Sequence, residues 1–159
     1  MGFSHLKKTV ITLYPMVLLL LTPFVLSCDN EDDIDDIFIG KTWYVTGATI
    51  NGTSITGDDI KSLYVSPSSY MIYFSSDNTF SGILAAGSHI SGSWNADGKK
   101  QKMSMSFTSS ENVNVTTLSS NIYNVLKDAT SYSGDVNNIQ IKEDSKNFVR
   151  FTSNRNHPE

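Results

Sequence analysis

The chain has 159 residues, which is enough for one domain of ordinary size. Its formal net charge is −4 and its Lys and Arg residues are dispersed, so it has no basic patch suited to nucleic acid. A single cysteine excludes an intramolecular disulfide, so the fold must be held together by its core.

The first 27 residues are predicted to be a targeting segment that is absent from the mature protein. Lys7 and Lys8 form a positive start, and an apolar stretch follows from about residue 10 to residue 24. This stretch leads into Val25-Leu26-Ser27-Cys28, which resembles the lipobox of bacterial lipoproteins. The resemblance implies that Cys28 is lipidated after residues 1–27 are cleaved as a lipoprotein signal peptide, so that the protein is held at a membrane.

Three other interpretations of this region stay open. Cys28 as an ordinary free thiol is the first, although a cysteine directly after such an apolar stretch is more often an acylation site. A membrane-spanning helix over residues 9–27 is the second, because a span needs roughly 18 apolar residues, but Pro15 and Pro23 interrupt it. A plain secretory signal peptide is the third, and it would not require the cysteine.

Residues 28–36 are predicted to form a solvated acidic tether between the lipid and the domain. Six of the eight residues that follow Cys28 are acidic, whereas the chain from Ile37 onward has ten basic and ten acidic residues. A run so charged and so poor in apolar residues buries too little surface to fold by itself. The acidic residues of the run are Asp29, Glu31, Asp32, Asp33, Asp35 and Asp36.

This acidic run resembles the export signal that follows the acylated cysteine in surface lipoproteins of Bacteroidetes. The resemblance implies that the six acidic residues direct the protein to the outer membrane, where it would be lipid-anchored and exposed at the cell surface. The alternative is a charged spacer with no address function.

Residues 37–159 are predicted to form one mainly β domain. They are rich in Ser, Thr, Asn and Gly, and short segments alternate between apolar and polar residues, which favours strands joined by tight turns. In the segment 102–108 the alternation is strict, with Met103, Met105 and Phe107 on one face. The predicted strands cover residues 41–46, 70–74, 79–84, 89–94, 102–108, 138–142 and 148–152, and the predicted turns or loops cover residues 51–52, 56–59, 75–78, 95–98, 134–135 and 143–147.

One segment departs from the period of two and is predicted to be a helix. Its apolar residues recur at helical spacing, and they are Leu118, Ile122, Val125, Leu126 and Ala129. Thr117 or Ser119 is expected to cap its start. A helix packed across a curved antiparallel sheet buries the apolar faces of both. The predicted fold class is therefore mainly β, an antiparallel open or closed barrel of about eight strands with one α-helix packed on it.

The order of aromatic and turn residues in the domain resembles a known β family. The segment Gly40-Lys41-Thr42-Trp43 is similar to the G-x-W start of lipocalin-like domains. Over essentially the whole domain, the pattern looks like the META (HslJ-like) domain and the related lipocalin-like lipoproteins of Bacteroidetes, which have no assigned function. The resemblance implies a half-open or closed lipocalin-like barrel and carries over no catalytic residue. The matching residues are Trp43, Phe74, Asp77, Phe80, Gly82, Gly92, Trp94, Tyr132, Gly134, Asp135 and Phe151.

The domain has few residues suited to catalysis, so the protein is predicted not to be an enzyme. After cleavage two histidines remain, His89 in a short strand and His157 in the polar tail. A Ser-His-Asp arrangement would need His89 as its base, and an exposed or turn-bonded histidine is the ordinary interpretation. No metal site and no cofactor are expected, because two distant histidines cannot close a zinc site and Asp135 lies in an incomplete calcium-like loop.

Aromatic residues are dense for a domain of this size, and they leave two interpretations. Most are expected to pack in the core and between strands, with Trp43 and Trp94 both pointing inward. The alternative is that Trp43, Tyr73 and Trp94 line a barrel mouth as ligand contacts for a small apolar molecule or a glycan.

Two functions are compatible with these features. The first is a membrane-anchored lipoprotein with a non-enzymatic binding domain for a small ligand or peptide. The alternative is a structural or accessory lipoprotein that contacts an outer-membrane protein. An open barrel interior would favour the first function, and a filled barrel with an exposed apolar patch would favour the second. Nucleic acid is not an expected partner in either case.

Overall fold

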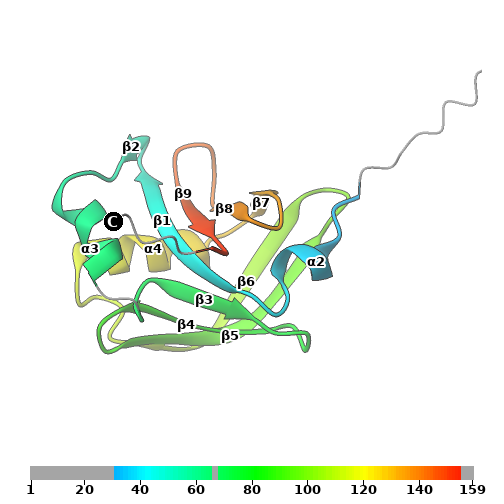
Figure 1. Ribbon diagram of the computed structural model, residues 1–159, viewed down its shortest axis with the longest axis horizontal. Coiled ribbons are helices and arrows are strands. Elements are labelled where there is room, and N and C mark those ends of the chain that lie inside the picture. Colours follow the sequence, from blue (N-terminus) through cyan, green and yellow to red (C-terminus); the bar gives the residue numbers. More distant parts are fainter. Residues whose placement is uncertain (1–30, 66–67, 155–159) are drawn as a thin grey trace, which may run out of the picture.

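The computed structural model describes residues 31–65 and 68–154 of the chain (Figure 1). The predicted signal peptide, Cys28 and Asp29 lie outside these residues, so the structure bears on the chain from Glu31 onward.

An antiparallel β-barrel makes up most of the described chain. From β3 to β9 each strand pairs with the next one along the sequence, and β1 closes the ring by pairing with β3 on one side and β9 on the other. The short strand β2 adds to the edge of β1 outside this ring. The ring thus has eight strands with β2 as one extra, which confirms the predicted class of a lipocalin-like barrel. The strands are β1 (Thr42–Ile50), β2 (Thr53–Ser54), β3 (Met71–Phe74), β4 (Thr79–Ala85), β5 (Ser88–Asp97), β6 (Lys102–Glu111), β7 (Ser131–Gly134), β8 (Asn138–Lys142) and β9 (Phe148–Thr152).

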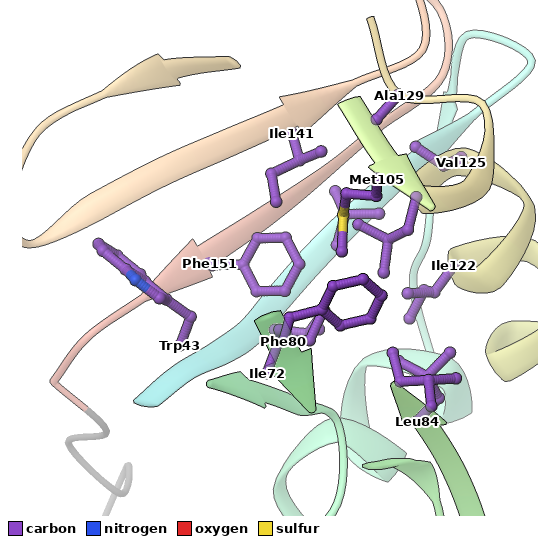
Figure 2. Close-up of a cluster of buried hydrophobic side chains, with 14 of the residues drawn as sticks. Trp43, Ile72, Phe80, Leu84, Met105, Ile122, Val125, Ala129, Ile141 and Phe151 are labelled. Atoms are coloured by element: carbon purple, nitrogen blue, oxygen red, sulfur yellow. The ribbon is translucent and has the colours of Figure 1, made fainter. Parts of the chain in front are cut away.

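Side chains alternate between the barrel interior and the solvent, as the sequence predicts. In β6, Met103 and Met105 are buried and Phe107 is half-buried, while Ser104 and Ser106 are exposed. The inward side chains of all strands of the ring belong to one hydrophobic cluster, part of which is drawn in Figure 2. The barrel interior is therefore a packed core.

Trp43 in β1 and Trp94 in β5 both point into this core, as predicted. Their side chains are 0% and 4% exposed. The Trp94 ring lies 5.3 Å from Phe38 and 5.2 Å from Phe74, measured between ring centroids. Within the described chain, neither buried indole Nε1–H has a hydrogen-bond acceptor. An unpaired buried donor costs free energy, so the stabilisation that the two tryptophans give to the barrel comes from apolar packing and not from hydrogen bonding.

Two irregularities bend the sheet around β5. The strand β4 contains one extra residue, Leu84, and β6 contains one extra residue, Thr108. Neither residue has a pairing partner in β5. Both are β-bulges, which increase the local twist and re-aim the side chains that follow. Gly92 lies beside the second bulge, where a Cβ atom would come within 2.0 Å of the Ser106 carbonyl oxygen. The tight curvature at this point therefore requires glycine.

The predicted helix is α4 (Thr117–Lys127), and it covers the barrel with its apolar stripe. Its cap is Thr116, one residue before the predicted Thr117. The Thr116 hydroxyl accepts a hydrogen bond from the Ser119 N–H at 3.0 Å, and the Ser119 hydroxyl accepts one from the Thr116 N–H at 3.0 Å. The stripe packs against β4, β6, β8 and β9, and its buried apolar residues are Leu118, Ile122, Val125 and Leu126.

Two further segments differ from their predicted structure. Residues 56–59 are predicted to be a turn or loop, and this is correct for residues 56 and 57. From Asp58 onward the chain instead forms α3 (Asp58–Val65) and buries Leu63, which is 1% exposed. Asp58 and Asp59 lie in the first turn of α3, where negative side chains stabilise the positive end of the helix dipole. The second hairpin is also longer than predicted, since β5 continues to Asp97 and the turn follows it instead of occupying residues 95–98.

The end of the acidic run is folded onto the barrel as helix α2 (Ile34–Phe38). Its cap is Asp33, whose carboxylate accepts a hydrogen bond from the Asp36 N–H at 3.1 Å. Ile37 and Phe38 are buried, and the Phe38 ring contacts three other aromatic rings of the core, from Phe74, Trp94 and Tyr132. The prediction of a solvated tether is therefore wrong for residues 32–36. The acidic residues are followed by two apolar residues that anchor the segment, and their carboxylates cap the helix or stay at its surface.

The helices α2 and α3 lie at opposite ends of the barrel in Figure 1. No helix in the described part of the chain combines the length and the apolar character that a membrane span needs.

Candidate functional site

A hollow lies on the outer face of the barrel. It has a volume of about 370 Å3 and spans the outward-facing side chains of five neighbouring strands, β1 and β3 to β6. Its lining residues are Thr42, Met71, Tyr73, Ser81, Gly82, Ile83, His89, Ile90, Ser91 and Ser109. The filled interior leaves this outer surface as the better candidate for a binding site.

A row of hydroxyl groups crosses the floor of the hollow, with one hydroxyl on each strand. The strand register pairs Thr42 with Tyr73, Tyr73 with Ser81, Ser81 with Ser91, and Ser91 with Ser109. Among the described residues, none of these five side-chain hydroxyls has a hydrogen-bond partner, so each keeps its capacity to donate and accept. We call these five residues the hydroxyl row.

The bulge in β6 completes the hydroxyl row. In strict alternation Ser109 would share the inward face of Phe107, but the extra residue Thr108 turns it outward opposite Ser91. The Thr108 hydroxyl holds the bulge by donating to the Ser91 carbonyl oxygen at 3.3 Å. The sequence alternation alone does not reveal this change of face.

A second row of side chains runs parallel to the hydroxyl row and is mostly apolar. Met71 pairs with Ile83, and Ile83 pairs with His89, so the three side chains follow one another across β3, β4 and β5. Tyr73 stands beside them and is 42% exposed, which makes it one of the large hydrophobic side chains that the folded chain leaves open to solvent. The hollow thus offers apolar surface and free hydroxyls next to each other.

Formal charge next to the hollow comes from Glu111, which pairs with the lining residue His89 in the strand register. In the described chain, none of its lining residues is Asp, Glu, Lys or Arg. The polar groups that line it are the hydroxyls and the His89 imidazole, and both can donate and accept hydrogen bonds. The arrangement suits an uncharged ligand that has both apolar faces and hydrogen-bonding groups.

A smaller hollow of about 290 Å3 lies where the barrel wall is weakest. The strands β6 and β7 pair at one position, Lys102 with Ser131, and the hollow opens beside it. Its lining residues are Asn95, Asp97, Lys102, Met103, Ser104, Ala129 and Thr130. No cluster of metal-ligating side chains is found here or elsewhere in residues 31–65 and 68–154.

Asp32 fastens the acidic run to the barrel next to this weak seam. The Tyr132 hydroxyl donates to the Asp32 carboxylate at 2.8 Å, and the Gln101 side-chain amide donates to it at 3.1 Å. The Asp32 N–H also donates to the Gly98 carbonyl oxygen at 3.4 Å. Burial, together with the hydrogen bond and charge of Asp32, raises the pKa of the Tyr132 phenol well above its ordinary value.

The residues predicted to have functional roles are separated by the structure. Tyr73 lines the outer hollow, whereas Trp43 and Trp94 are buried in the core and line neither hollow. Of the acidic residues, Asp32 and Asp33 make contacts that hold the fold, while Glu31, Asp35 and Asp36 are exposed. The predicted lipidation site Cys28, and Asp29 of the predicted export signal, lie outside the described residues.

The fold defines the protein as a lipocalin-like β-barrel with a short N-terminal helix docked at one end. Residues 29–153 match the family model DUF4847, a domain of unknown function, and the chain belongs to this family. The crystal structure of a DUF4847 family protein from Bacteroides vulgatus ATCC 8482 is similar, with a TM-score of 0.60 and 23% sequence identity over 77% of this chain and 99% of that chain. At that identity the likeness shows the fold alone. A comparison with curated proteins finds no match. The likeness to META domains stays a prediction.

Proposed function

We propose that this protein is a lipoprotein of the outer membrane, anchored through Cys28 and exposed at the cell surface, whose barrel binds a small ligand or peptide without catalysis. The observation that carries the binding proposal is the outer hollow, where five unpartnered hydroxyls lie beside exposed apolar side chains. The packed interior argues against a ligand inside the barrel, so the ligand site is assigned to the outer face.

The docking of Asp32 supports a fixed placement of the domain relative to such an anchor. Between Cys28 and Asp32 there are three residues, so the chain spans at most about 14 Å. The α2 end of the barrel would then lie close to the membrane, and the α3 end would point away from it.

The accessory function is the second candidate, and exposed valines favour it. Val65 at the end of α3 is 80% exposed, and Val115 before α4 is 55% exposed. The Tyr70 hydroxyl lies 3.5 Å from the Thr116 hydroxyl, which connects the segment after α3 to the segment before α4. An outer-membrane protein whose extramembrane part extends past the barrel would contact this end, and cross-linking from Val65→Cys in intact cells would detect it.

A ligand screen on the full chain in detergent tests the binding proposal. The probes are short peptides, neutral oligosaccharides and small amphiphiles, and the readout is the rise in the thermal unfolding midpoint on binding. A probe of the hollow should stabilise the wild type and Ser93→Ala, but not Tyr73→Ala. Ser93 is the matched control because it is exposed on β5 outside the hollow. The proposal is overturned if no probe stabilises the wild type, or if every stabilising probe acts equally on Tyr73→Ala.

A further inference from the structure

The spacing of the hydroxyl row points to the kind of ligand that would follow it. The row runs perpendicular to the strands, and neighbouring strands lie about 4.8 Å apart. Its four steps from Thr42 to Ser109 therefore place five backbone positions over about 19 Å, measured along the curved sheet. A ligand that uses the whole row must be a chain whose own repeat matches this spacing.

An extended peptide does not match the repeat. Its residues rise by about 3.3 Å, and the side chains on one face recur at about twice that distance, so neither period equals the strand spacing. A chain of six-membered sugar rings in extended linkage advances by about one ring length per residue, which is close to the strand spacing. Successive rings in such a chain can be turned over, but each ring has hydroxyls on both edges, so every ring still presents a hydrogen-bonding group to the row. Each ring of such a chain would meet one hydroxyl of the row.

The chemistry of the hollow agrees with this geometry. Sugar rings present C–H groups on their faces and hydroxyls at their edges, so they pack on apolar or aromatic side chains while they hydrogen-bond to polar ones. Met71, Tyr73 and Ile83 supply the apolar contacts, and the hydroxyl row supplies the hydrogen bonds. The lining has no Lys or Arg within the described chain, and the carboxylate of Glu111 stands opposite its His89 in the strand register, so the hollow is poorly suited to a uronate, sulfate or phosphate.

We propose that the outer face of β1 and β3 to β6 is a binding site for an extended, neutral saccharide chain that lies across the strands along the hydroxyl row. This inference rests on the proposed function, since it names the ligand class of the same hollow. It also assigns a positioning role to the β6 bulge, which brings the last hydroxyl into line.

Calorimetric titration of the full chain in detergent tests the ligand class. The neutral probes are the β1→4-linked hexaoses of glucose, mannose and N-acetylglucosamine, and the comparison probes are hexagalacturonate and an uncharged decapeptide of Gly and Ser. We expect at least one neutral hexaose to bind and the two comparison probes to give no heat of binding. The corresponding triose should bind about tenfold more weakly, because it reaches only part of the row.

Two paired variants test the location. Ser81→Ala with Ser91→Ala removes two hydroxyls of the row on adjacent strands and should lower the affinity for the hexaose by about tenfold. Ser93→Ala with Ser106→Ala removes two exposed hydroxyls that pair across β5 and β6 outside the hollow, and it should leave the affinity within about twofold. The four serines lie on the outer surface, so both variants should have the same unfolding midpoint when unfolding is followed by circular dichroism.

The outcomes separate this inference from the proposed function. If the decapeptide binds in a manner that depends on Tyr73 and no hexaose binds, the saccharide assignment is wrong and the binding function stands. If hexagalacturonate binds as well as the neutral hexaoses, the neutrality of the ligand is wrong. If both paired variants lower the affinity for the hexaose equally, the hydroxyl row is not the site. If no hexaose binds but a peptide or amphiphile of the ligand screen stabilises the wild type and not Tyr73→Ala, the saccharide assignment fails and the binding function stands. If no probe of either experiment binds, both proposals fail.

Discussion

At the scale of single residues, Phe38 joins the N-terminal segment to the barrel core. Its ring centroid lies 5.3 Å from that of Trp94 and 5.1 Å from that of Tyr132, so the three side chains form one aromatic contact network at the α2 end. Tyr132 then reaches the Asp32 carboxylate with its hydroxyl. Packing and hydrogen bonding at this point depend on the same residues.

Trp94→Ala tests how much the barrel depends on this packing. Removing a buried ring leaves a cavity that a closed sheet cannot fill, so the free energy of unfolding should fall by about 3–5 kcal/mol. A domain of this size has about 5–15 kcal/mol in total, so the variant should be marginally folded. Trp94→Phe should lose much less, because it keeps an aromatic ring and removes the unpaired indole N–H. Thermal melts measure both, and a Trp94→Ala melt equal to that of the wild type would contradict the inward placement.

The raised pKa of Tyr132 predicts a loss of stability at alkaline pH. The phenol has an ordinary pKa of 10.0 in the unfolded chain and a higher pKa in the folded barrel. The folded state therefore holds the proton more tightly, so its stabilising effect is complete below pH 10 and declines as the pH rises toward the folded pKa. Tyr132→Phe should be less stable at pH 7 by about 1–2 kcal/mol, through loss of the hydrogen bond to a carboxylate, and its alkaline decline should be shallower. Unfolding in urea between pH 7 and 11 measures the two slopes, and parallel slopes would rule out the Tyr132 phenol as their source.

At the scale of elements, seven of the eight strands in the ring were predicted from the sequence, whereas β7 and the short helices were not. The period of two in β6 and the apolar spacing in α4 are local signals, because each side chain's face follows from its position in the segment. The helix α2 has five residues and begins inside an acidic run, so its stability comes from the burial of Ile37 and Phe38 against strands far along the chain. The hydroxyl row depends on strand register and on the bulge at Thr108, which local periodicity does not specify.

The helix α4 offers a matched pair of substitutions. Ile122 is 0% exposed on the buried stripe, so Ile122→Asp places an unpaired charge in the core and should unfold most of the protein. Asn124 is exposed two residues later, so Asn124→Asp should change the free energy of unfolding by less than about 0.5 kcal/mol. Circular dichroism melts compare the two, and similar melts for both variants would mean that the stripe is not a core contact.

In the folded part of the predicted export signal, Asp32 contacts the barrel, whereas Asp35 and Asp36 are exposed. Asp32→Asn weakens the contact with Tyr132 and Gln101, so it should lower the melting temperature. Asp35→Asn with Asp36→Asn alters two exposed carboxylates of α2, so it should leave the melt nearly unchanged. If these carboxylates belong to an export address, the double variant should be protected when intact cells are treated with protease, whereas the wild type is cleaved. Equal cleavage of the double variant and the wild type would count against a role of this pair in export.

At the scale of the whole molecule, the docked acidic segment and the hollow occupy different parts of one domain. Asp32 is docked at the α2 end, four residues after Cys28, so a lipid on Cys28 would be separated from the barrel by a short stretch of chain. The hollow lies on the side of the barrel, across β1 and β3 to β6, and it does not include α2. A ligand in the hollow would therefore not compete with the docked segment for the same surface.

Cys28→Ala tests the anchor on which this arrangement depends. Without the thiol no diacylglycerol can be attached, so the variant should incorporate no palmitate analogue and should remain an uncleaved precursor at the inner membrane or be degraded. The free energy of unfolding of the barrel should stay the same, because the hydrogen bonds that dock the segment begin at Asp32. Ser27→Ala is the matched control, since it keeps a small residue before the cysteine and should be labelled like the wild type. Metabolic labelling followed by membrane fractionation measures the outcome, and equal labelling of Cys28→Ala and the wild type would remove the basis for the lipid anchor and for the proposed surface location.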